Sequence, residues 1–295
     1  MKAYYHLPGL FEYYEFYKKF LPIFYSHKEY FYDDVEIGSI YGVSSDCIWS
    51  GGRVGGGEVS SKDVIDLMNQ YNIPSRLTLS NALLTNQHLN DLKSNKLVED
   101  FMNTNILTGI IIHSDLLLEY LKENYPGYYY ISSTTKVITN KDEILEEIRN
   151  NDYKYVVLDY RYNHNLEFLN RLNDQEKEKI ELLCNECCDI RCNERKACYE
   201  NVSHINLGHH VLEHVCPYTD KDGYKFSDAM KNPSFISRGD IQDVYLPMGI
   251  NQFKIEGRGL GTAILLEFIL YYLVKPEYHL ILREAIYLDS MLDLF

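Results

Sequence analysis

From residue 35 onward, short apolar runs alternate with stretches in which apolar residues recur at helical spacing. This alternation predicts parallel strands joined by crossover helices. Eight such units in succession favour a closed barrel over an open, doubly wound sheet, and no GxGxxG fingerprint follows the first run. We therefore predict an α/β fold, a (β/α)8 TIM-like barrel. The expected strands are 35–43, 75–80, 108–113, 128–132, 155–159, 180–184, 234–236 and 252–256.

Two segments fall outside this regular alternation. Residues 1–34 are aromatic and amphipathic, and we predict that they form an N-terminal helical cap over one end of the barrel. Residues 185–232, after the sixth expected strand, are too long for a simple connector, and loops of this length in compact domains are usually functional. We therefore expect one barrel domain over 35–295, with a long Cys-rich insertion at 185–232.

The composition is that of a globular chain, with 45% hydrophobic and 24% charged residues. The formal net charge is −14, and an acidic protein repels phosphate backbones at long range, which argues against bulk nucleic-acid binding. No apolar run reaches the roughly 18 residues of a membrane span, and the first residues show no signal-peptide pattern. We expect a cytoplasmic protein whose cysteines are reduced thiols or metal ligands.

Six of the seven cysteines gather between Cys184 and Cys216. Thiolates at such spacing can converge on one soft metal centre, and four of them suit either a [4Fe–4S] cluster or tetrahedral zinc. The predicted metal ligands are Cys188, Cys192, Cys198 and Cys216. Cys187 is a reserve ligand, and Cys47, in the loop after the first expected strand, can replace one of the four. Cys184 continues an apolar run, so we expect it to be a buried core residue.

Three motifs stand out along the chain. The first is ISRGDIQDVYLPMGINQFKIEGRG, in which a helix introduced by an Asp leads through a Gly-containing turn to a strand ending in KIEGR. The second is IELLCNECCDIRCNERKACYENVSH, and the third is IGSIYGVSSDCIWSGGR. Together they span residues 36–275, and they resemble the U-32 type of collagenase-like peptidases and their relatives.

The resemblance implies a TIM-like barrel and, as in several relatives, a [4Fe–4S] cluster held by four cysteines. Members are identified as collagenase-like peptidases, and others assist the hydroxylation of RNA or quinones. The better-known members have a cysteine near the seventh strand, where this chain has FISRGD. The resemblance therefore implies that Cys198 and Cys216 complete the ligand set.

Polar side chains at the carboxyl ends of the expected strands should face the barrel mouth, where barrels of this type carry their chemistry. Glu256 and Arg258, two residues apart on an extended strand, point to the same side and suit the binding of a polar substrate. Arg53 lies within the Gly-rich loop SGGRVGGG, whose glycines allow an anion to approach the backbone closely. The predicted catalytic residues are Asn185, Glu186, Glu256 and Arg258, and the predicted cofactor-binding residues are Arg53, His113 and Asp159.

A pair of histidines follows the cysteines. On a helix, His210 and His214 would share one face, as metal ligands four residues apart do. The glutamate between them is at position 213, which is not its place in the HExxH motif, so a zinc peptidase of that class is not indicated.

Three functions remain open. The first is an iron–sulfur enzyme that acts on an RNA base, a quinone or another small polar or aromatic substrate, through oxygen-independent, hydroxylation-like chemistry. The second is a peptidase of the collagenase-like family, although no nucleophile–base pair is evident in the sequence. The third is a non-catalytic binding subunit in which the metal staples a long loop and the aromatic N-terminal segment docks a protein partner in a hetero-complex.

Overall fold

Eight parallel strands close into a barrel in the order β1 to β8, and β1 pairs with both β2 and β8. This is seen in a computed structural model that describes residues 1–52, 59–102, 104, 106–212, 214–218, 226–257 and 259–288. The strands are β1 (Ala3–Pro8), β2 (Val35–Gly42), β3 (Ser75–Leu79), β4 (Gly109–Ile112), β5 (Tyr129–Ser132), β6 (Tyr153–Val157), β7 (Ile180–Leu183) and β8 (Gln252–Lys254). The predicted (β/α)8 class is confirmed.

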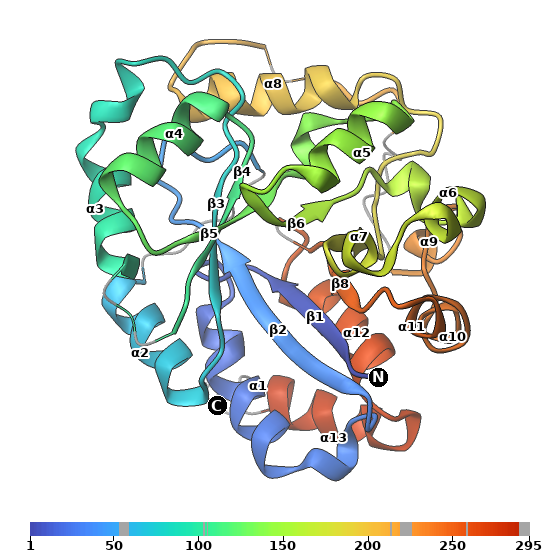
Figure 1. Ribbon diagram of the computed structural model, residues 1–295. Coiled ribbons are helices and arrows are strands. Elements are labelled where there is room, and N and C mark those ends of the chain that lie inside the picture. Colours follow the sequence, from blue (N-terminus) through green and yellow to red (C-terminus); the bar gives the residue numbers. More distant parts are fainter. Residues whose placement is uncertain are drawn as a thin grey trace.

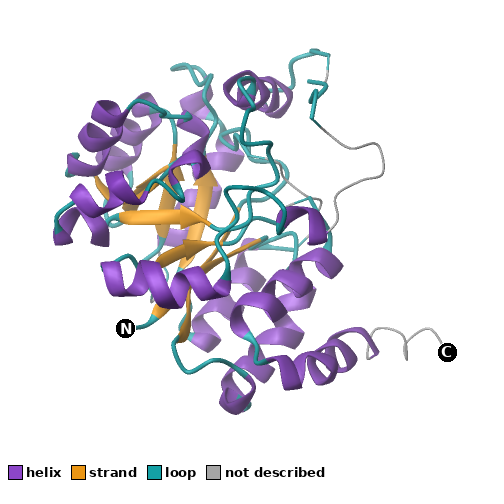
Figure 2. Cartoon of the chain, turned by 90° about the vertical axis from the view of Figure 1, so that its right-hand side faces the viewer, coloured by secondary structure: helices purple, strands orange, loops and turns teal. Residues whose placement is uncertain are grey.

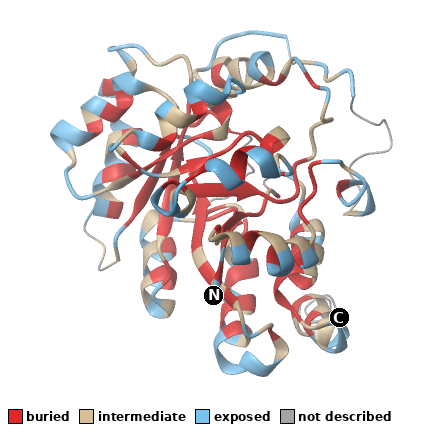
Figure 3. Ribbon diagram, turned by 45° about the vertical axis from the view of Figure 1, so that its right-hand side comes forward, coloured by how far each residue is buried: buried red, intermediate tan, exposed pale blue. Residues whose placement is uncertain are grey.

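Helices surround the strands (Figure 2). They are α1 (Tyr14–Ser26), α2 (Ser61–Tyr71), α3 (Leu92–Met102), α4 (Asp115–Asn124), α5 (Lys141–Arg149), α6 (Leu166–Arg171), α7 (Asp174–Glu178), α8 (Arg195–Asn206), α9 (Phe226–Ala229), α10 (Arg238–Asp240), α11 (Leu246–Met248), α12 (Thr262–Leu273) and α13 (His279–Arg283). Buried residues gather on the strands and on the helix faces that cover them (Figure 3). Within the described residues, no helix combines the length and the apolar character that a membrane crossing requires.

Helix α2 illustrates how the local sequence sets the element boundaries. Ser60 caps its first turn, since the side-chain oxygen accepts a hydrogen bond from the backbone N–H of Asp63. Asn72 ends the helix in the left-handed conformation, with φ of 52°. The buried residues at helical spacing, which turn one face to the barrel, are Val64, Leu67 and Met68.

The prediction of a helical cap over residues 1–34 is wrong at its start. Ala3–Pro8 form β1, a full member of the barrel, and only from Tyr14 does the segment become helical. Two features hide this strand in the sequence. Its central His6 is polar but fully enclosed by the barrel, and its tyrosines give an amphipathic appearance. Most aromatic residues of α1 belong to the core, as the burial of Phe16, Tyr17 and Phe20 indicates, whereas Tyr25 is 40% exposed.

The seventh expected strand, 234–236, is wrong as well. The backbone N–H of Ile236 donates to the carbonyl of Cys184 at 2.9 Å, which places this segment beside the end of β7. Ser234 is held in a turn, because its backbone N–H and its hydroxyl both donate to Oδ1 of Asn232. Helix α10 begins at Arg238, two residues after Ile236, so the chain is too short here for a strand ladder. The expected number of strands, eight, is nevertheless correct, because the extra strand predicted at 234–236 replaces β1, which was not predicted.

The Cys-rich insertion 185–232 follows the seventh strand of the barrel, β7, and contains helices α8 and α9 within what we expected to be a loop. Helix α8 lies across the end of the barrel toward which β1 and β2 point (Figure 1). Hydrogen bonds tie it there: Nδ2 of Asn81 donates to the carbonyl of Ser203 at 3.2 Å, and Nδ2 of Asn206 donates to that of Ser50 at 2.7 Å. The insertion therefore covers the mouth at which the strands end.

Candidate functional site

The site begins where the adjacent strands β7 and β8 end. The Asn185 side chain pairs with the backbone of Glu256: its Oδ1 accepts from the N–H at 2.7 Å, and its Nδ2 donates to the carbonyl at 2.9 Å. These two bonds extend the β7–β8 pairing beyond Lys254, the last residue of the ladder. Asn185, predicted to be catalytic, therefore joins the strand ends and positions Glu256 at the mouth.

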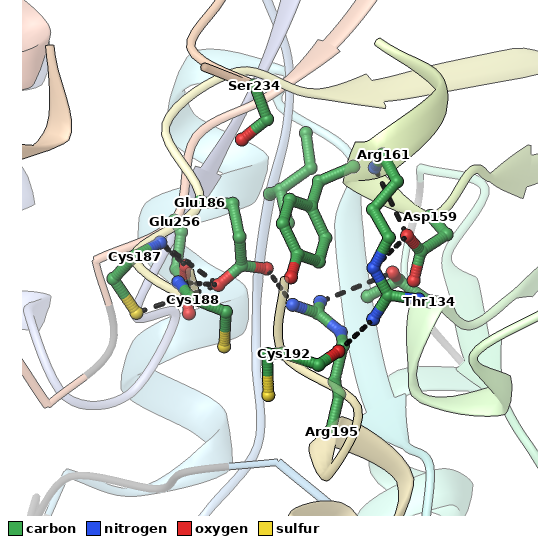
Figure 4. Close-up of polar contacts among 12 residues, drawn as sticks. Thr134, Asp159, Arg161, Glu186, Cys187, Cys188, Cys192, Arg195, Ser234 and Glu256 are labelled. Carbon is green, nitrogen blue, oxygen red and sulfur yellow. Dashed lines mark hydrogen bonds and ion pairs between the residues drawn. The ribbon is translucent and has the colours of Figure 1, made fainter. Parts of the chain in front are cut away.

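Glu186 lies at the centre of the site and is 1% exposed (Figure 4). Its Oε1 accepts hydrogen bonds from the backbone N–H groups of Cys187 and Cys188, each at 3.0 Å. Its Oε2 lies 2.5 Å from Nη1 of Arg195. Burial alone would raise the pKa of Glu186, but the Arg195 charge and the hydrogen bonds lower it to about 2. Glu186 is therefore ionised at neutral pH.

The carboxyl group of Glu256 lies against that of Glu186. A side-chain hydrogen bond joins the two, and Oε2 of Glu256 also accepts from the backbone N–H of Cys187 at 3.4 Å. A hydrogen bond between two carboxyl groups needs one proton, which the pair shares. A carboxyl group that can release a proton beside a fixed carboxylate is suited to general acid–base chemistry.

Arg195 reaches the site from the first turn of α8 and is 1% exposed. The centre of its guanidinium group lies 4.6 Å from the ring of Tyr160 and 5.2 Å from that of Tyr199. Its Nη2 is 3.5 Å from Oγ1 of Thr134, at the end of β5. The rings and the Glu186 carboxylate replace the water that the guanidinium loses on burial. No sequence pattern singles out Arg195, because it lies outside every expected strand.

The predicted metal ligands share one segment without forming a single-ion site. In the described part of the chain, one group of three potential ligands has its donor atoms within 4.8 Å of one another, namely Glu186, Cys187 and Cys188. The predicted ligands outside that group are Cys192, Cys198 and Cys216. Tetrahedral zinc requires sulfur atoms about 3.8 Å apart, given Zn–S bonds of about 2.3 Å. An iron–sulfur cluster is larger, and its ligands stand further apart. The Cys-rich segment thus offers ligands for a metal.

Contacts with the barrel fix the position of this segment. Cys192 is buried, and its carbonyl accepts a hydrogen bond from Nη2 of Arg161 at 3.0 Å. Cys198 lies on α8, three residues after Arg195 and therefore near the same helix face. In Figure 4 the sulfur atoms of Cys188 and Cys192 both point downward. Three of the four predicted ligands thus belong to the structure around the Glu186–Arg195 pair.

The two remaining cysteines lie in the core. Cys184 is fully buried, as expected from its place in an apolar run. Cys47 is 3% exposed, and its Sγ lies 3.4 Å from Oγ of Ser94 on α3. Burial raises the pKa of the Cys47 thiol to about 11, so it is protonated at neutral pH. This contact gives Cys47 a structural place apart from the Cys-rich segment.

The predicted cofactor-binding residues are spread around the mouth. Asp159 is buried after β6, and its Oδ1 accepts from the backbone N–H of Arg161 at 3.1 Å. Nδ1 of His113, after β4, lies 2.9 Å from Oγ1 of Thr135. Burial lowers the pKa of His113 to about 4, so it is neutral at pH 7. The predicted site residues that lie outside the described residues are Arg53 and Arg258.

The histidines after the cysteines do not form a helical pair. Helix α8 ends at Asn206, so His210 and His214 are not on one helix face. Nε2 of His214 lies 3.4 Å from Oε2 of Glu194. This is a partly exposed contact at the start of α8.

A second charged group lies deeper in the barrel. Glu181 of β7 is fully buried, with its Oε2 2.5 Å from Nη1 of Arg76 and its Oε1 3.6 Å from Nζ of Lys254. Nε2 of His6 is 3.5 Å from the same carboxylate. Burial, together with the Arg76 charge, lowers the pKa of His6 to about 3. Burial alone would raise the pKa of Glu181, but Arg76, with smaller effects of its other neighbours, lowers it to about 2.

Two patterns in the sequence do point to this interior group. Arg76 and Glu181 are single charged residues within apolar runs, and such residues on a barrel strand face either solvent or the interior. Lys254 has the same strand parity as Glu256, so the two side chains point to the same side. A prediction that considers strand ends alone does not include Arg76, Glu181 or Lys254.

A pocket of about 60 Å³ lies between the interior group and α8. It lies at the carboxyl ends of the strands, where barrels of this type bind their substrates. Its lining comes from β2, β3, β4, β7 and β8, from residues that follow strands, and from α8: Tyr41, Gly52, Thr78, Ser80, Ile111, Ser133, Thr134, Thr135, Leu183, Tyr199, Lys254 and Glu256.

Comparison with protein-family models gave no match, and comparison with curated proteins gave none. Among solved structures, the chain is similar to the U32 peptidase Mk0906, with a TM-score of 0.51 and 12% sequence identity; the similarity covers 86% of this chain and 92% of that chain. The barrel is U32-like. At this identity the likeness shows the fold alone, so the function has to be argued from the site.

Proposed function

We propose that the chain is a U32-like enzyme that binds a metal in its Cys-rich segment and transforms a small polar or aromatic substrate at the barrel mouth. The position of Glu186 carries this proposal. Its carboxylate accepts hydrogen bonds from the N–H groups of Cys187 and Cys188 and also contacts Glu256. The potential metal ligands and the acid–base pair therefore meet at one place above the pocket.

The donor set suits a [4Fe–4S] cluster, with zinc as the alternative metal. The proposed ligands are Cys188, Cys192, Cys198 and Cys216, with Cys187 in reserve. A bound cluster would supply one-electron chemistry. A reducing compartment such as the cytoplasm would keep the ligands as thiols.

The protein's own residues have separate tasks in this proposal. Glu186 stays ionised and orients the backbone of Cys187 and Cys188. Glu256 exchanges a proton with the substrate, because it is the member of the carboxyl pair that lines the pocket. Asn185 holds the Glu256 backbone in place through its two hydrogen bonds.

The mouth has further proposed substrate contacts. Arg258, two residues after Glu256, is proposed to bind a polar group of the substrate on account of its spacing. His113 follows β4 and Asp159 follows β6, and Arg53 belongs to a Gly-rich stretch of the sequence, so these three residues are proposed to contact the substrate or cofactor.

A peptidase activity is the second candidate, and the carboxyl pair favours it. Two carboxyl groups that share one proton can activate a water molecule for amide hydrolysis. The similar solved structure is that of a U32 peptidase. In this alternative Glu256 would take the proton from water, and the metal would only stabilise the insertion.

The two candidates differ in their dependence on metal. We would assay wild type, Glu256→Gln and Cys188→Ala against a panel of quinones and RNA nucleosides under reducing, anaerobic conditions, and against fluorogenic gelatin peptides. The proposed function predicts turnover of a small substrate that both variants lose, while Glu256→Gln keeps its metal. Peptide cleavage that survives in metal-free Cys188→Ala and disappears in Glu256→Gln would favour the peptidase and contradict the first proposal.

A further inference from the structure

The segment that follows helix α8 folds back along the helix. Nδ2 of Asn201 donates a hydrogen bond to the carbonyl of Leu212 at 2.8 Å, and Oδ1 of Asn201 accepts one from the backbone N–H of His214 at 3.1 Å. At the start of α8, Nε2 of His214 lies 3.4 Å from Oε2 of Glu194. The chain therefore returns along α8 from its last turn toward its first, and we call residues 207–212 the return segment.

A tight turn at Gly208 produces this reversal. Gly208 has φ of 74°, a left-handed conformation that glycine adopts far more readily than other residues. Its N–H donates to the carbonyl of Ile205 at 2.9 Å, and the N–H of His209 donates to the carbonyl of His204 at 3.0 Å. The turn therefore brings the His209 side chain back beside that of His204.

The rings of His204 and His209 meet through the same nitrogen. Nδ1 of one lies 2.9 Å from Nδ1 of the other, and the ring centres are 5.2 Å apart. Two lone pairs at this distance repel each other, so either one nitrogen carries a proton or a cation lies between them. Two nitrogen ligands of one metal ion stand about 2.8–3.4 Å apart, given metal–nitrogen bonds of about 2.0–2.1 Å and bond angles of about 90–110°. The histidine pair therefore has the spacing of two ligands of one ion.

The surroundings of the pair suit a metal ion that arrives from solvent. His204 is half-buried and His209 is exposed, so an ion can reach both nitrogens and keep part of its water shell. Imidazole suits zinc, nickel and copper, whereas magnesium and calcium prefer oxygen ligands. Within the described part of the chain, no third histidine, cysteine or carboxylate brings a ligand atom within 4.8 Å of both nitrogens. Water would therefore complete the coordination.

The histidine pair is separate from the proposed metal ligands of the Cys-rich segment. Arg195 and His204 are nine residues apart on α8, which is two and a half turns, so their side chains leave opposite sides of the helix. Arg195 is the one that reaches the strand ends. Cys198 precedes His204 by six residues, or about 9 Å along the helix axis. An ion held by the histidines is therefore a second metal.

We propose that His204 and His209 bind one divalent transition-metal ion, with zinc as the probe, and that this ion holds the return segment against α8. Both histidines belong to the insertion that covers the barrel mouth. Helix α8 itself is tied to the barrel by the hydrogen bonds at Ser203 and Asn206. The ion therefore fixes the outer layer of the cover and leaves the strands unchanged. This inference goes beyond the proposed function and does not rest on it.

The test is an anaerobic titration of the full chain, labelled with 15N-histidine, with Zn²⁺ followed by NMR, and Mg²⁺ is the cation control. Zinc should shift the Nδ1 signals of two histidines, which His204→Gln and His209→Gln assign. Each of these substitutions should weaken zinc binding at this site by about tenfold or more, since one of two nitrogen ligands is lost. His210→Gln is the matched control, because His210 is an exposed neighbour outside the pair. This variant should bind zinc like wild type.

Gly208→Ala keeps both ligands and changes only their placement. A Cβ at Gly208 would meet nothing within 4 Å, so the variant should fold. Alanine disfavours the left-handed φ of the turn, so zinc binding should weaken by about fivefold. Hydrogen exchange gives the second measurement. Zinc should slow amide exchange in residues 207–212 and leave the barrel strands unaffected.

Three results would overturn the inference. They are the absence of histidine shifts with zinc, which would leave the pair as a hydrogen bond alone, shifts that survive in both His204→Gln and His209→Gln, and zinc binding in Gly208→Ala equal to that of wild type. Unchanged exchange of the return segment would contradict the effect on the cover.

A titration of Cys188→Ala separates this inference from the proposed function. Histidine shifts in that variant support the second site even if the metal of the Cys-rich segment proves wrong. Loss of the shifts there would show that the two sites are not separate and would contradict the inference.

Discussion

Arg195 of α8 and Glu186 after β7 form an ion pair in which both side chains are 1% exposed and Nη1 lies 2.5 Å from Oε2. This pair connects the helix that covers the barrel mouth with the strand end that carries the proposed site. Glu186 in turn orients two cysteine N–H groups. Direct contacts therefore join helix α8, the Glu186–Glu256 carboxyl pair and the Cys-rich segment.

Arg195→Met should destabilise the fold by about 3–5 kcal/mol, because it leaves the Glu186 carboxylate buried without its partner. Urea unfolding measures this loss, and hydrogen exchange should show faster exchange in α8 than in the barrel strands. Arg191→Met is the matched control. Its ion pair with Asp189 has a 75% exposed arginine, so its loss should change stability far less than the loss of the buried pair. Equal effects of the two substitutions would contradict the importance of the buried pair.

Glu181→Gln should cost a similar amount, about 3–5 kcal/mol, because Arg76 and Lys254 would then face each other without a carboxylate. Glu167→Gln, which removes an exposed helix-surface pair with Arg171, should change stability by less than about 0.5 kcal/mol. Both variants can be compared by urea unfolding at pH 7. A Glu181→Gln variant as stable as wild type would mean that the interior cations do not depend on this carboxylate.

The unfolding free energy should decrease as the pH is lowered below about 6.5. The folded-state pKa of His6 is lowered to about 3, so between these values the unfolded chain binds a proton that the folded chain does not. The unfolding free energy then rises with pH, with a limiting slope of about 1.4 kcal/mol per pH unit for His6. His113, whose pKa is lowered to about 4, acts in the same direction.

The variant His6→Gln tests this assignment. Unfolding free energies at pH 5.0, 5.5 and 6.0 should depend less steeply on pH in the variant than in wild type, because the titrating ring is gone. Above pH 6.5 the two proteins should have parallel profiles. A slope that His6→Gln leaves unchanged would place the pH dependence on other groups.

Much of the barrel is predictable from its apolar runs, and the exceptions have physical reasons. Seven of the expected runs overlap strands of the barrel. β1 escapes prediction because His6, a polar residue, faces a barrel interior that hydrogen-bonds it through Ser39 and Gln252. The apolar run at 234–236 was wrongly predicted to be a strand, because apolar residues near a strand end can be buried by packing without joining the sheet.

The candidate site is predictable in part. Asn185, Glu186 and Glu256 follow from the rule that strand ends carry the chemistry, and the structure brings them together. Arg195 does not follow from it, because a helix folded back over the mouth supplies it from a segment expected to be a loop. Thr78 and Lys254 lie inside strands, and their place in the pocket depends on closure of the barrel.

The metal in the Cys-rich segment is the central claim, and its direct test is the metal content of anaerobically purified protein. We would measure iron, acid-labile sulfide and zinc together with the visible absorbance spectrum, for wild type, Cys188→Ala and the core control Cys47→Ala. The account predicts about four irons and four sulfides per chain with a broad visible band. Cys188→Ala should lose them and Cys47→Ala should keep them. Wild-type protein without iron or zinc, or metal that Cys188→Ala retains in full, would contradict the account.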